Sequence, residues 1–256
     1  MEQHHRPDQT NSTTAPANPL IRKLEQRDTL APEEKQALDK AMARGRIKEF
    51  RTKEEMVREH DEPSFSTLLL DGWAARYKSL SDGRRQMLAF HISGDFVDLH
   101  AFPLKVQDHS VVALTPCKVV LVPHEALNEI TENFPHLTRL LWVSTLIDGA
   151  IVREWLLSTG RRSAIEHVAN LMCETYTRLQ AIGLAKADEF NFPLTQAELG
   201  DALGISTVHV NRVLQDLRKE GLITWKGDRI EINDWDRLCA LADFDPTYLH
   251  LDQRPR

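Results

Sequence analysis

The sequence predicts an α+β chain in which a unit of short β-strands precedes a long helix, with two further helices and a β-hairpin near the C-terminus. Three observations predict this order. Turn residues separate short apolar runs between residues 46 and 123, and residues 136–160 are apolar on most sides of one helix. Residues 194–217 form two amphipathic segments around a glycine.

The composition is typical of a folded protein and narrows its class. The 256 residues are 41% hydrophobic and 27% charged, with a formal net charge of −6, which leaves room for one or two domains. The N-terminal MEQHHRPDQT has no apolar core and no run is long enough to span a bilayer, so we expect a cytoplasmic protein without a signal peptide or membrane contact. Three scattered cysteines indicate a reducing compartment and give no zinc, iron–sulfur or other metal site: Cys117, Cys173 and Cys239.

The chain is expected to begin with a tail and a helical segment. Residues 1–17 are polar and contain two prolines, which predicts disorder. Residues 18–45 should be helical, because Pro32 suits a first helical position, Glu33 falls in the first turn and Gly45 ends the pattern.

Short strands and turns then alternate up to residue 123. The turn signals are Asp71-Gly72, Asp82-Gly83 and Thr115-Pro116, which favour a small barrel or sandwich. With the preceding helices and a short helix at 124–134, this part forms a predicted domain over residues 18–135.

The helix expected at residues 136–160 must be covered on most of its sides. One face should pack on the β-strands and another should meet the same helix of a second copy. The alternative is a helix central to one larger core. Trp142, Val152 and Leu156 lie on one side, and the residues assigned to the dimer helix are Leu137, Leu140, Ser144, Ile147 and Ile151.

The stretch from Leu194 to Leu217 predicts two helices joined by a tight turn. Thr195 can cap the first helix while Glu198 reaches back to it, and Gly204 tolerates the left-handed conformation that ends a helix. Ser206 then caps the second helix, whose predicted buried face is Val210, Val213, Leu214 and Leu217.

The opposite face of the second helix suits DNA bases. Thr207, Val208, Asn211 and Arg212 share this face near the N-terminal end, which enters the major groove in helix-turn-helix proteins. Arginine pairs with guanine, asparagine pairs with adenine, and a valine or threonine methyl contacts a thymine methyl. The alternative is an ordinary helical hairpin with a solvated polar face. The net charge of −6 says little about DNA binding, because only the electrostatic field at the docking surface attracts phosphates.

A β-hairpin at residues 221–232 follows the two helices directly. This position is typical of a wing, and Lys226 and Arg229 near its tip could contact the DNA backbone. The alternative is that the hairpin only covers the core, and the two roles do not exclude each other. It belongs to a predicted domain over residues 161–256.

From about residue 30 onward, this order resembles the Crp/Fnr family of bacterial transcription regulators. GDFVDLHAF, residues 94–102, resembles part of the family's cyclic-nucleotide-binding-like β-roll. LTQAELGDALGISTVHVNRVLQDLRKEGLI, residues 194–223, resembles its helix-turn-helix, including both glycines and the final Gly-Leu-Ile. The resemblance implies a β-roll, a long dimerisation helix and a winged helix-turn-helix, in a homodimer that binds a pseudo-palindromic promoter site on double-stranded DNA, with RNA polymerase as a further partner.

The resemblance places the base-reading positions on the same four residues, Thr207, Val208, Asn211 and Arg212. Arg212 matches an arginine common in the family, whereas Val208 stands where many members have a base-contacting glutamate. Contacts to the DNA backbone or the edge of the site are assigned to Thr195, Gln196, Ser206, His209, Gln215, Arg218, Lys226 and Arg229.

The effector region departs from the cyclic-AMP-binding members, which hold the ribose with a glutamate and the phosphate with an Arg-Ser or Arg-Thr pair. Here the corresponding residues are Asp98-Leu99 and His109-Ser110. Because the arginine that suits a phosphate is missing, we do not expect cyclic AMP. These four residues are assigned to the pocket of an unidentified small molecule, unless the protein acts without one.

Other chemistry remains open in the β-strand domain. The cysteine cluster of oxygen-sensing members does not occur before Cys117, and heme ligation by His91, His100 or His109 is an alternative. A cupin-type metal enzyme with a C-terminal interaction module is a second functional class. It needs clustered metal ligands on strands, whereas His91 and His100 are nine residues apart and no His-x-His occurs there, so we expect a regulator without enzyme activity.

Overall fold

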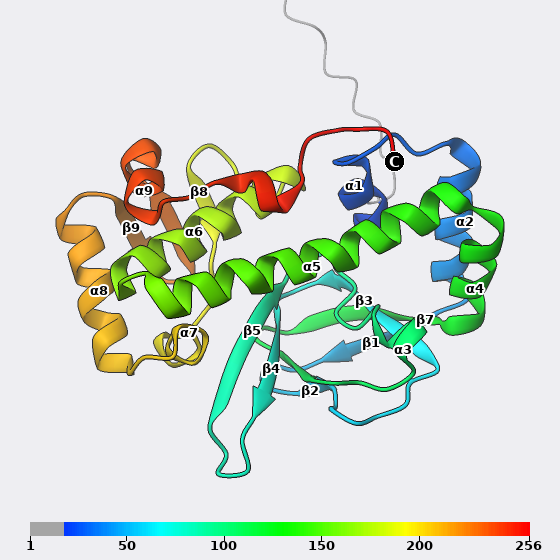
Figure 1. Ribbon diagram of the computed structural model, residues 1–256, viewed down its shortest axis with the longest axis horizontal. Helices are drawn as coiled ribbons and strands as arrows, with labels where there is room; N and C mark the ends of the chain where they lie inside the picture. The colour runs from blue at the N-terminus through cyan, green and yellow to red at the C-terminus, as the bar shows by residue number, and fades with distance from the viewer. Residues whose placement is uncertain (1–17) are drawn as a thin grey trace, which may run out of the picture.

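A computed structural model describes residues 18–256, so the tail predicted at residues 1–17 lies outside the described residues. One long helix, α5 (Pro135–Arg161), crosses the molecule, and both halves of the chain pack against it (Figure 1). Among residues 18–256, no helix has the length and apolar character needed to cross a membrane.

The helical segment predicted at residues 18–45 is confirmed as two helices, α1 (Pro19–Glu25) and α2 (Pro32–Ala43). Proline occupies the start of both helices, where its missing N–H costs nothing. Leu20 and Leu24 of α1 are buried, so this short helix is held by packing on the domain behind it.

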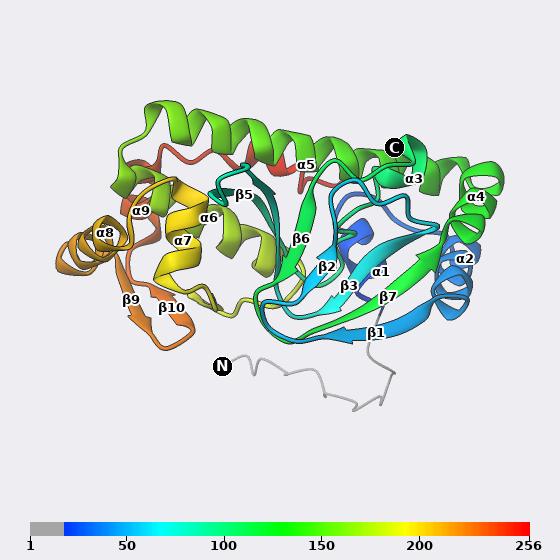
Figure 2. The ribbon, with the colours of Figure 1, turned by 90° about the horizontal axis from the view of Figure 1, so that it is seen from below.

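Seven strands form the predicted β-domain as two antiparallel sheets (Figure 2). One sheet has the order β1-β7-β3 and the other β2-β6-β4-β5. The turn at Asp71-Gly72 carries the chain from one sheet to the other, whereas Asp82-Gly83 closes the β4–β5 hairpin. The strands are β1 (Arg46–Phe50), β2 (Glu55–Val57), β3 (Phe65–Asp71), β4 (Ala74–Ser79), β5 (Arg85–His91), β6 (Ser110–Ala113) and β7 (Cys117–Pro123).

Between β5 and β6 lies a short helix, α3 (Ala101–Leu104), that the sequence did not predict. After β7, α4 (His124–Asn133) leads directly into α5. These two sheets with their flanking helices are called the β-roll below.

The dimer face assigned to α5 from the sequence is wrong. Leu137, Leu140, Ile147 and Ile151 are almost fully buried inside their own chain, and Ser144 is half-buried. They face the core because the β-roll and the C-terminal helices pack on that side of α5. The apolar residues that remain exposed lie on the opposite side: Trp142, Leu146, Leu156 and Leu157.

The C-terminal part contains the predicted helix pair and hairpin. After α6 (Ala164–Ala181), the pair is α7 (Gln196–Leu203) and α8 (Thr207–Lys219), followed by β9 (Ile223–Lys226) and β10 (Arg229–Ile232). The sequence did not predict a third strand, β8 (Glu189–Asn191), which pairs with β10 and makes the wing a three-stranded sheet of order β8-β10-β9. The chain then forms α9 (Trp235–Ala242) and a 3-10 turn at Pro246–Leu249.

One hydrophobic core connects the β-roll to the C-terminal part. Trp73 and Phe192 meet edge to face with ring centroids 6.0 Å apart, and Phe90 and Trp155 do so at 5.2 Å. The β4–β5 hairpin also reaches α7, where Arg85 Nε lies 2.6 Å from Asp201 Oδ2. The predicted domains therefore share a core in this structure.

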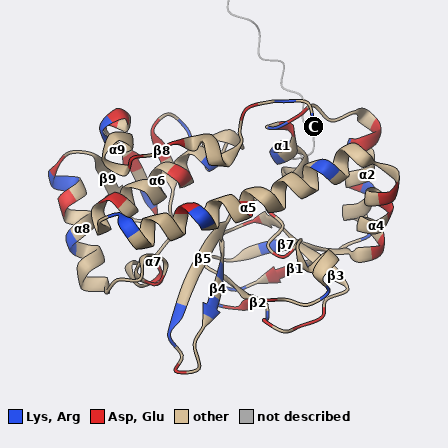
Figure 3. Ribbon diagram, in the orientation of Figure 1, with Lys and Arg blue, Asp and Glu red and all other residues tan. Residues whose placement is uncertain are grey.

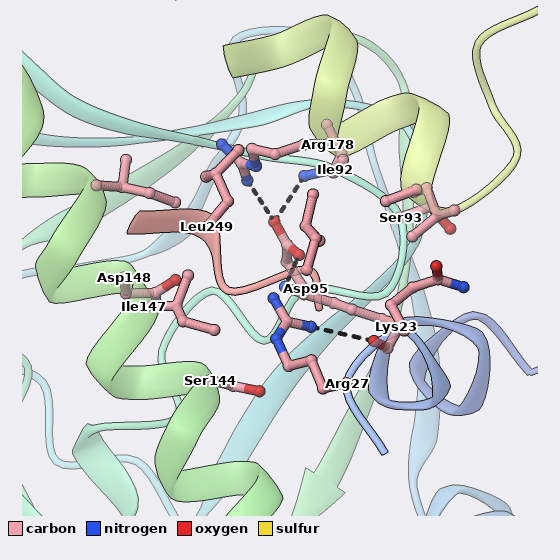
Figure 4. A pocket seen from close by; sticks show the side chains of 15 residues that line it. Lys23, Arg27, Ile92, Ser93, Asp95, Ser144, Ile147, Asp148, Arg178 and Leu249 are labelled. Atoms are coloured by element: carbon pink, nitrogen blue, oxygen red, sulfur yellow. Dashed lines mark hydrogen bonds and ion pairs between the residues drawn. The ribbon is translucent and has the colours of Figure 1, made fainter. Parts of the chain in front are cut away.

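A buried charge cluster lies where α1, the β-roll, α5 and α6 meet (Figure 4). Asp95 is its centre: the carboxylate pairs with Lys23, and Arg178 Nη2 donates to it over 3.0 Å. Burial alone would raise the pKa of Asp95, but Lys23, the neighbouring His91 and Arg178 hold that pKa well below its usual value. We call this cluster the Asp95 junction; it ties α6 to the β-roll.

Candidate nucleic-acid interface

The helix pair α7–α8 is built by the local signals that predicted it. Thr195 Oγ1 accepts a hydrogen bond from the backbone N–H of Glu198 over 3.2 Å, and the Glu198 carboxylate accepts from the Thr195 N–H over 2.8 Å. Gly204 ends α7 with φ of 68°, and Ser206 Oγ accepts from the His209 N–H over 3.3 Å. The predicted buried face of α8 is confirmed: Val210, Val213, Leu214 and Leu217.

The opposite face of α8 is open to solvent. Thr207, Val208, Asn211 and Arg212 are all exposed there. They line one shallow groove, to which Gln196 of α7 and Gln215 of α8 also contribute. The structure therefore brings the four predicted base-reading residues together on one surface, with two amides at its rim.

Asn211 is held by its two glutamine neighbours. Its Nδ2 donates to Gln196 Oε1 over 3.3 Å, and its Oδ1 accepts from Gln215 Nε2 over 2.9 Å. An amide has two N–H donors and two acceptor lone pairs, so one donor and one acceptor of Asn211 remain. That pair is what the major-groove edge of adenine requires.

Arg212 and Val208 complete the face in different ways. Within residues 18–256, the Arg212 guanidinium has no ion-pair or hydrogen-bond partner, so all its donors are available. Val208 is 74% exposed, so its side chain contributes little to packing within the chain. An exposed valine can contact a thymine methyl group while its hydrogen-bonding neighbours contact adjacent base edges.

The predicted backbone contacts divide into free and engaged side chains. His209, Arg218 and Lys226 are exposed, and Gln215 is exposed but donates to Asn211. The hydroxyls of Thr195 and Ser206 serve as helix caps, although both residues are exposed. Gln196 is half-buried and bonds to Asn211. The charged residues of α8 are one acidic residue between basic ones (Figure 3), so individual side chains, not a continuous basic surface, would attract phosphates.

Arg229 differs from the other predicted backbone contacts, because its guanidinium already has a partner. Its Nη1 lies 2.6 Å from Glu189 Oε1 on β8, and this contact raises the pKa of Arg229. The sequence did not predict β8 and so could not show this pair. Lys226 is the freer cation at the wing.

Two of the residues assigned to an effector pocket have structural roles instead. Asp98 Oδ1 accepts from the Thr67 N–H over 2.6 Å, and Ser110 Oγ accepts from the Glu59 N–H over 3.0 Å. Burial raises the pKa of Asp98 to about 7. Leu99 is buried in a hydrophobic cluster beside Phe96 and Phe102. The four assigned residues therefore do not line one open pocket.

The fourth residue, His109, lies beside two groups that the sequence did not single out together. Its Nδ1 is 2.7 Å from Asp108 Oδ1, and the rings of His109 and His100 lie with centroids 4.6 Å apart and planes tilted by 39°. His91, the third histidine weighed as a heme ligand, instead faces Asp95 at 3.7 Å. The histidines are thus divided between two sites.

Two domain families match the chain. Residues 166–241 match the Crp-like helix-turn-helix domain, and residues 47–134 match the cyclic nucleotide-binding domain. The first match contains α7, α8 and the wing, and the second contains the seven strands of the β-roll apart from the first residue of β1.

Characterised relatives cover most of the chain. The transcriptional activator protein FnrL of Cereibacter sphaeroides is 30% identical over 189 residues, which are 72% of this chain and 75% of that protein. The transcriptional activator protein anr of Pseudomonas aeruginosa is 28% identical over 84% of this chain and 86% of its own. The solved structure of FixK2 from Bradyrhizobium japonicum, at 28% identity, superposes with a TM-score of 0.70 and covers 77% of this chain and 96% of that one.

Proposed function

The chain belongs to the Crp/Fnr family of transcription regulators, and on that basis we propose that it acts as a homodimer on a pseudo-palindromic promoter site. Each copy would place the N-terminal half of α8 in a major groove, with the two grooves about one helical turn apart. The family membership also removes the cupin-type enzyme, because the relatives are transcription regulators.

The exposed face of α8 is the observation that carries this proposal. Thr207, Val208, Asn211 and Arg212 offer a methyl, an amide pair and a free guanidinium at one helix end. Base contacts from these groups would specify the site, while phosphate contacts from Arg218 would set the register.

The second copy would meet the exposed face of α5. Trp142, Leu146, Gly149, Arg153 and Leu156 follow one another at steps of four, three, four and three residues. This spacing is typical of the seam between two helices in a coiled coil, and the Trp142, Leu146 and Leu156 side chains are open to solvent in the single chain. The seam replaces the one assigned from the sequence, which lies inside the protomer.

Further partners follow from the proposed function. A promoter-bound regulator acts through RNA polymerase, which we propose as a partner. We do not propose cyclic AMP as the effector, because His109-Ser110 replaces the arginine-containing pair and both residues are buried. A different small effector would act in the β-roll.

Fluorescence anisotropy with labelled promoter fragments tests the reading face. Arg212→Ala should reduce the discrimination between preferred and unrelated fragments by about 1–3 kcal/mol per half-site. Lys226→Ala should weaken binding to all fragments by a similar factor and lower the salt dependence, because it removes a phosphate contact. Arg51→Ala, an exposed arginine of the β-roll, is the matched control and should change neither. An unchanged site preference in Arg212→Ala would show that the assigned face does not read bases.

A further inference from the structure

Several buried polar atoms of the β-roll have no hydrogen-bond partner in the described part of the chain. Such atoms are rare in folded proteins, so a group of them needs a physical explanation. Within residues 18–256, eight atoms of this kind lie in the β-roll: Thr67 Oγ1, Arg76 Nε, His91 Nε2, Asp98 Oδ2, His100 Nε2, His109 Nε2, and Nε2 and Oε1 of Gln107. The Asp95 carboxylate, by comparison, pairs with both Lys23 and Arg178.

Three residues before α3 and β6 carry metal-ligating groups close together, and two of them, His100 and His109, each hold one of these unpartnered nitrogens. One donor atom each from His100, Asp108 and His109 can be chosen so that all three lie within 4.8 Å of one another. His100 Nε2 is 3.4 Å from Asp108 Oδ1, and His109 Nδ1 is 2.7 Å from the same oxygen. Ligands of a tetrahedral zinc ion lie about 3–3.5 Å apart, given bonds of about 2.1 Å. Small side-chain rotations would therefore bring the three donor atoms to these distances.

We propose that His100, Asp108 and His109 bind one divalent first-row transition metal ion, of which Zn²⁺ is the representative probe. Two imidazoles and one carboxylate are a donor set that such ions favour. The Asp108 side chain is 70% exposed, which gives the ion a path from solvent and leaves a coordination position for water or a further ligand.

The charges around the site act in both directions. The Arg76 guanidinium, which adds to burial in lowering the pKa of both imidazoles, repels a cation. Its Nη2 lies 3.4 Å from the Asp148 carboxylate, however, and Asp108 adds a second negative charge. We expect weaker binding than in a closed structural zinc site.

The position of the site links it to the long helix. His100 precedes α3, and Asp108 and His109 precede β6, so an ion would fix both ends of the loop between them. Arg76 of β4 faces the site and contacts Asp148 of α5. An ion bound here would therefore act on one of the β-roll residues that contact the long helix. Metal binding itself does not depend on the proposed DNA-binding function and is measured without DNA.

Isothermal titration calorimetry with Zn²⁺ and absorption spectroscopy with Co²⁺ test the site. The protein should be the full chain without a polyhistidine tag, in a His4→Ala/His5→Ala background, because those adjacent histidines could bind metal alone. We expect one ion per chain. Asp108→Asn, His100→Ala and His109→Ala should each weaken binding at least about tenfold, since each removes a ligand. The matched controls Asp82→Asn and His209→Ala, both at exposed residues, should bind as the parent does.

The Co²⁺ spectrum decides the case even if a buried histidine variant fails to fold. Nitrogen and oxygen ligation gives d–d bands without thiolate charge transfer, and Asp108→Asn, at an exposed position, should weaken them while its circular dichroism stays that of the parent. A thiolate band would instead place the ion at Cys173 and Cys239, whose sulfurs are 3.9 Å apart, and would overturn the proposal. So would a lack of stoichiometric binding, or equal affinity in the parent and Asp108→Asn.

Discussion

Helices α5 and α8 both expose apolar side chains, but the surroundings of these side chains differ. On α8, Val208 stands alone among threonine, asparagine and arginine. On α5, Trp142, Leu146 and Leu156 are 65%, 56% and 72% exposed and follow one line along the helix. An isolated methyl group among hydrogen-bonding groups suits a base edge, whereas a continuous apolar line suits another protein surface.

The energetics point to the same division. Burying an exposed leucine completely is worth about 1.5–3 kcal/mol, so several such residues in line can hold two helices together. The α8 face has one small apolar side chain, and its polar groups would lose hydrogen bonds with water in an apolar interface. Its partner must therefore offer donors and acceptors, as DNA does.

The largest effect is expected from disrupting the α5 face. Leu146→Asp combined with Leu156→Asp should convert the dimer to a monomer, because buried unpaired charges would face each other across the seam. Affinity for a preferred site should then fall at least about 1,000-fold, towards non-specific binding. Sedimentation and anisotropy measure both effects. Leu80→Asp, at an exposed leucine of the β4–β5 hairpin, should remain dimeric; a dimeric double variant would place the seam elsewhere.

The Asp95 junction should contribute next, because it holds the C-terminal part against the β-roll. Asp95→Asn should lower the free energy of unfolding by about 3–5 kcal/mol at pH 7, since it leaves Lys23 and Arg178 with less compensation. The folded-state pKa of Asp95 lies below its unfolded value, so its contribution is present above about pH 4 and is lost as the pH falls.

Denaturant unfolding of both proteins between pH 7 and pH 3 measures this effect. The difference between parent and Asp95→Asn should shrink below about pH 4. A difference that grows at low pH would contradict the assigned ion pairs. Asp82→Asn, in the exposed hairpin turn, should track the parent throughout.

Asn211→Ala should have a smaller effect that is confined to sequence preference. Loss of the remaining donor–acceptor pair should cost about 1–3 kcal/mol at one adenine position in each half-site. Anisotropy on fragments substituted at single positions would locate that base pair. Equal losses at every fragment would mean that Asn211 contacts only the backbone.

Val208→Ala should have the smallest effect, about 1 kcal/mol or less, through a lost methyl contact with thymine. The matched change Val208→Glu should move the preference at the same position towards cytosine, whose amino group donates to a carboxylate. If neither change alters any position, Val208 does not touch the bases.

The helix pair could be predicted because its determinants are local. The Thr195–Glu198 capping box, Gly204 and the spacing of Val210 and Leu214 are all readable within 25 residues. The short elements α3 and β8 were missed because their stability comes from packing and from pairing with β10.

Which face of α5 is exposed could not be predicted from periodicity. Leu140 and Ile147 on one side and Trp142 and Leu156 on the other are both apolar at helical spacing. Which side meets its own chain depends on where the β-roll and α6 pack. His100 and His109 were named as separate candidate heme ligands and not as a pair, because the loop between α3 and β6 brings them together with Asp108 without a His-x-His pattern.

In this interpretation, a dimer formed through α5 reads DNA with the α8 helices of both copies. The most direct test is selection of binding sites from random duplex DNA with the full chain. We expect the selected sites to be inverted repeats with half-sites centred about 10–11 base pairs apart. Arg212→Ala should lose a guanine and Asn211→Ala an adenine at symmetric positions of both halves. Selection of single, non-repeated sites, or of no preferred sequence, would contradict the account.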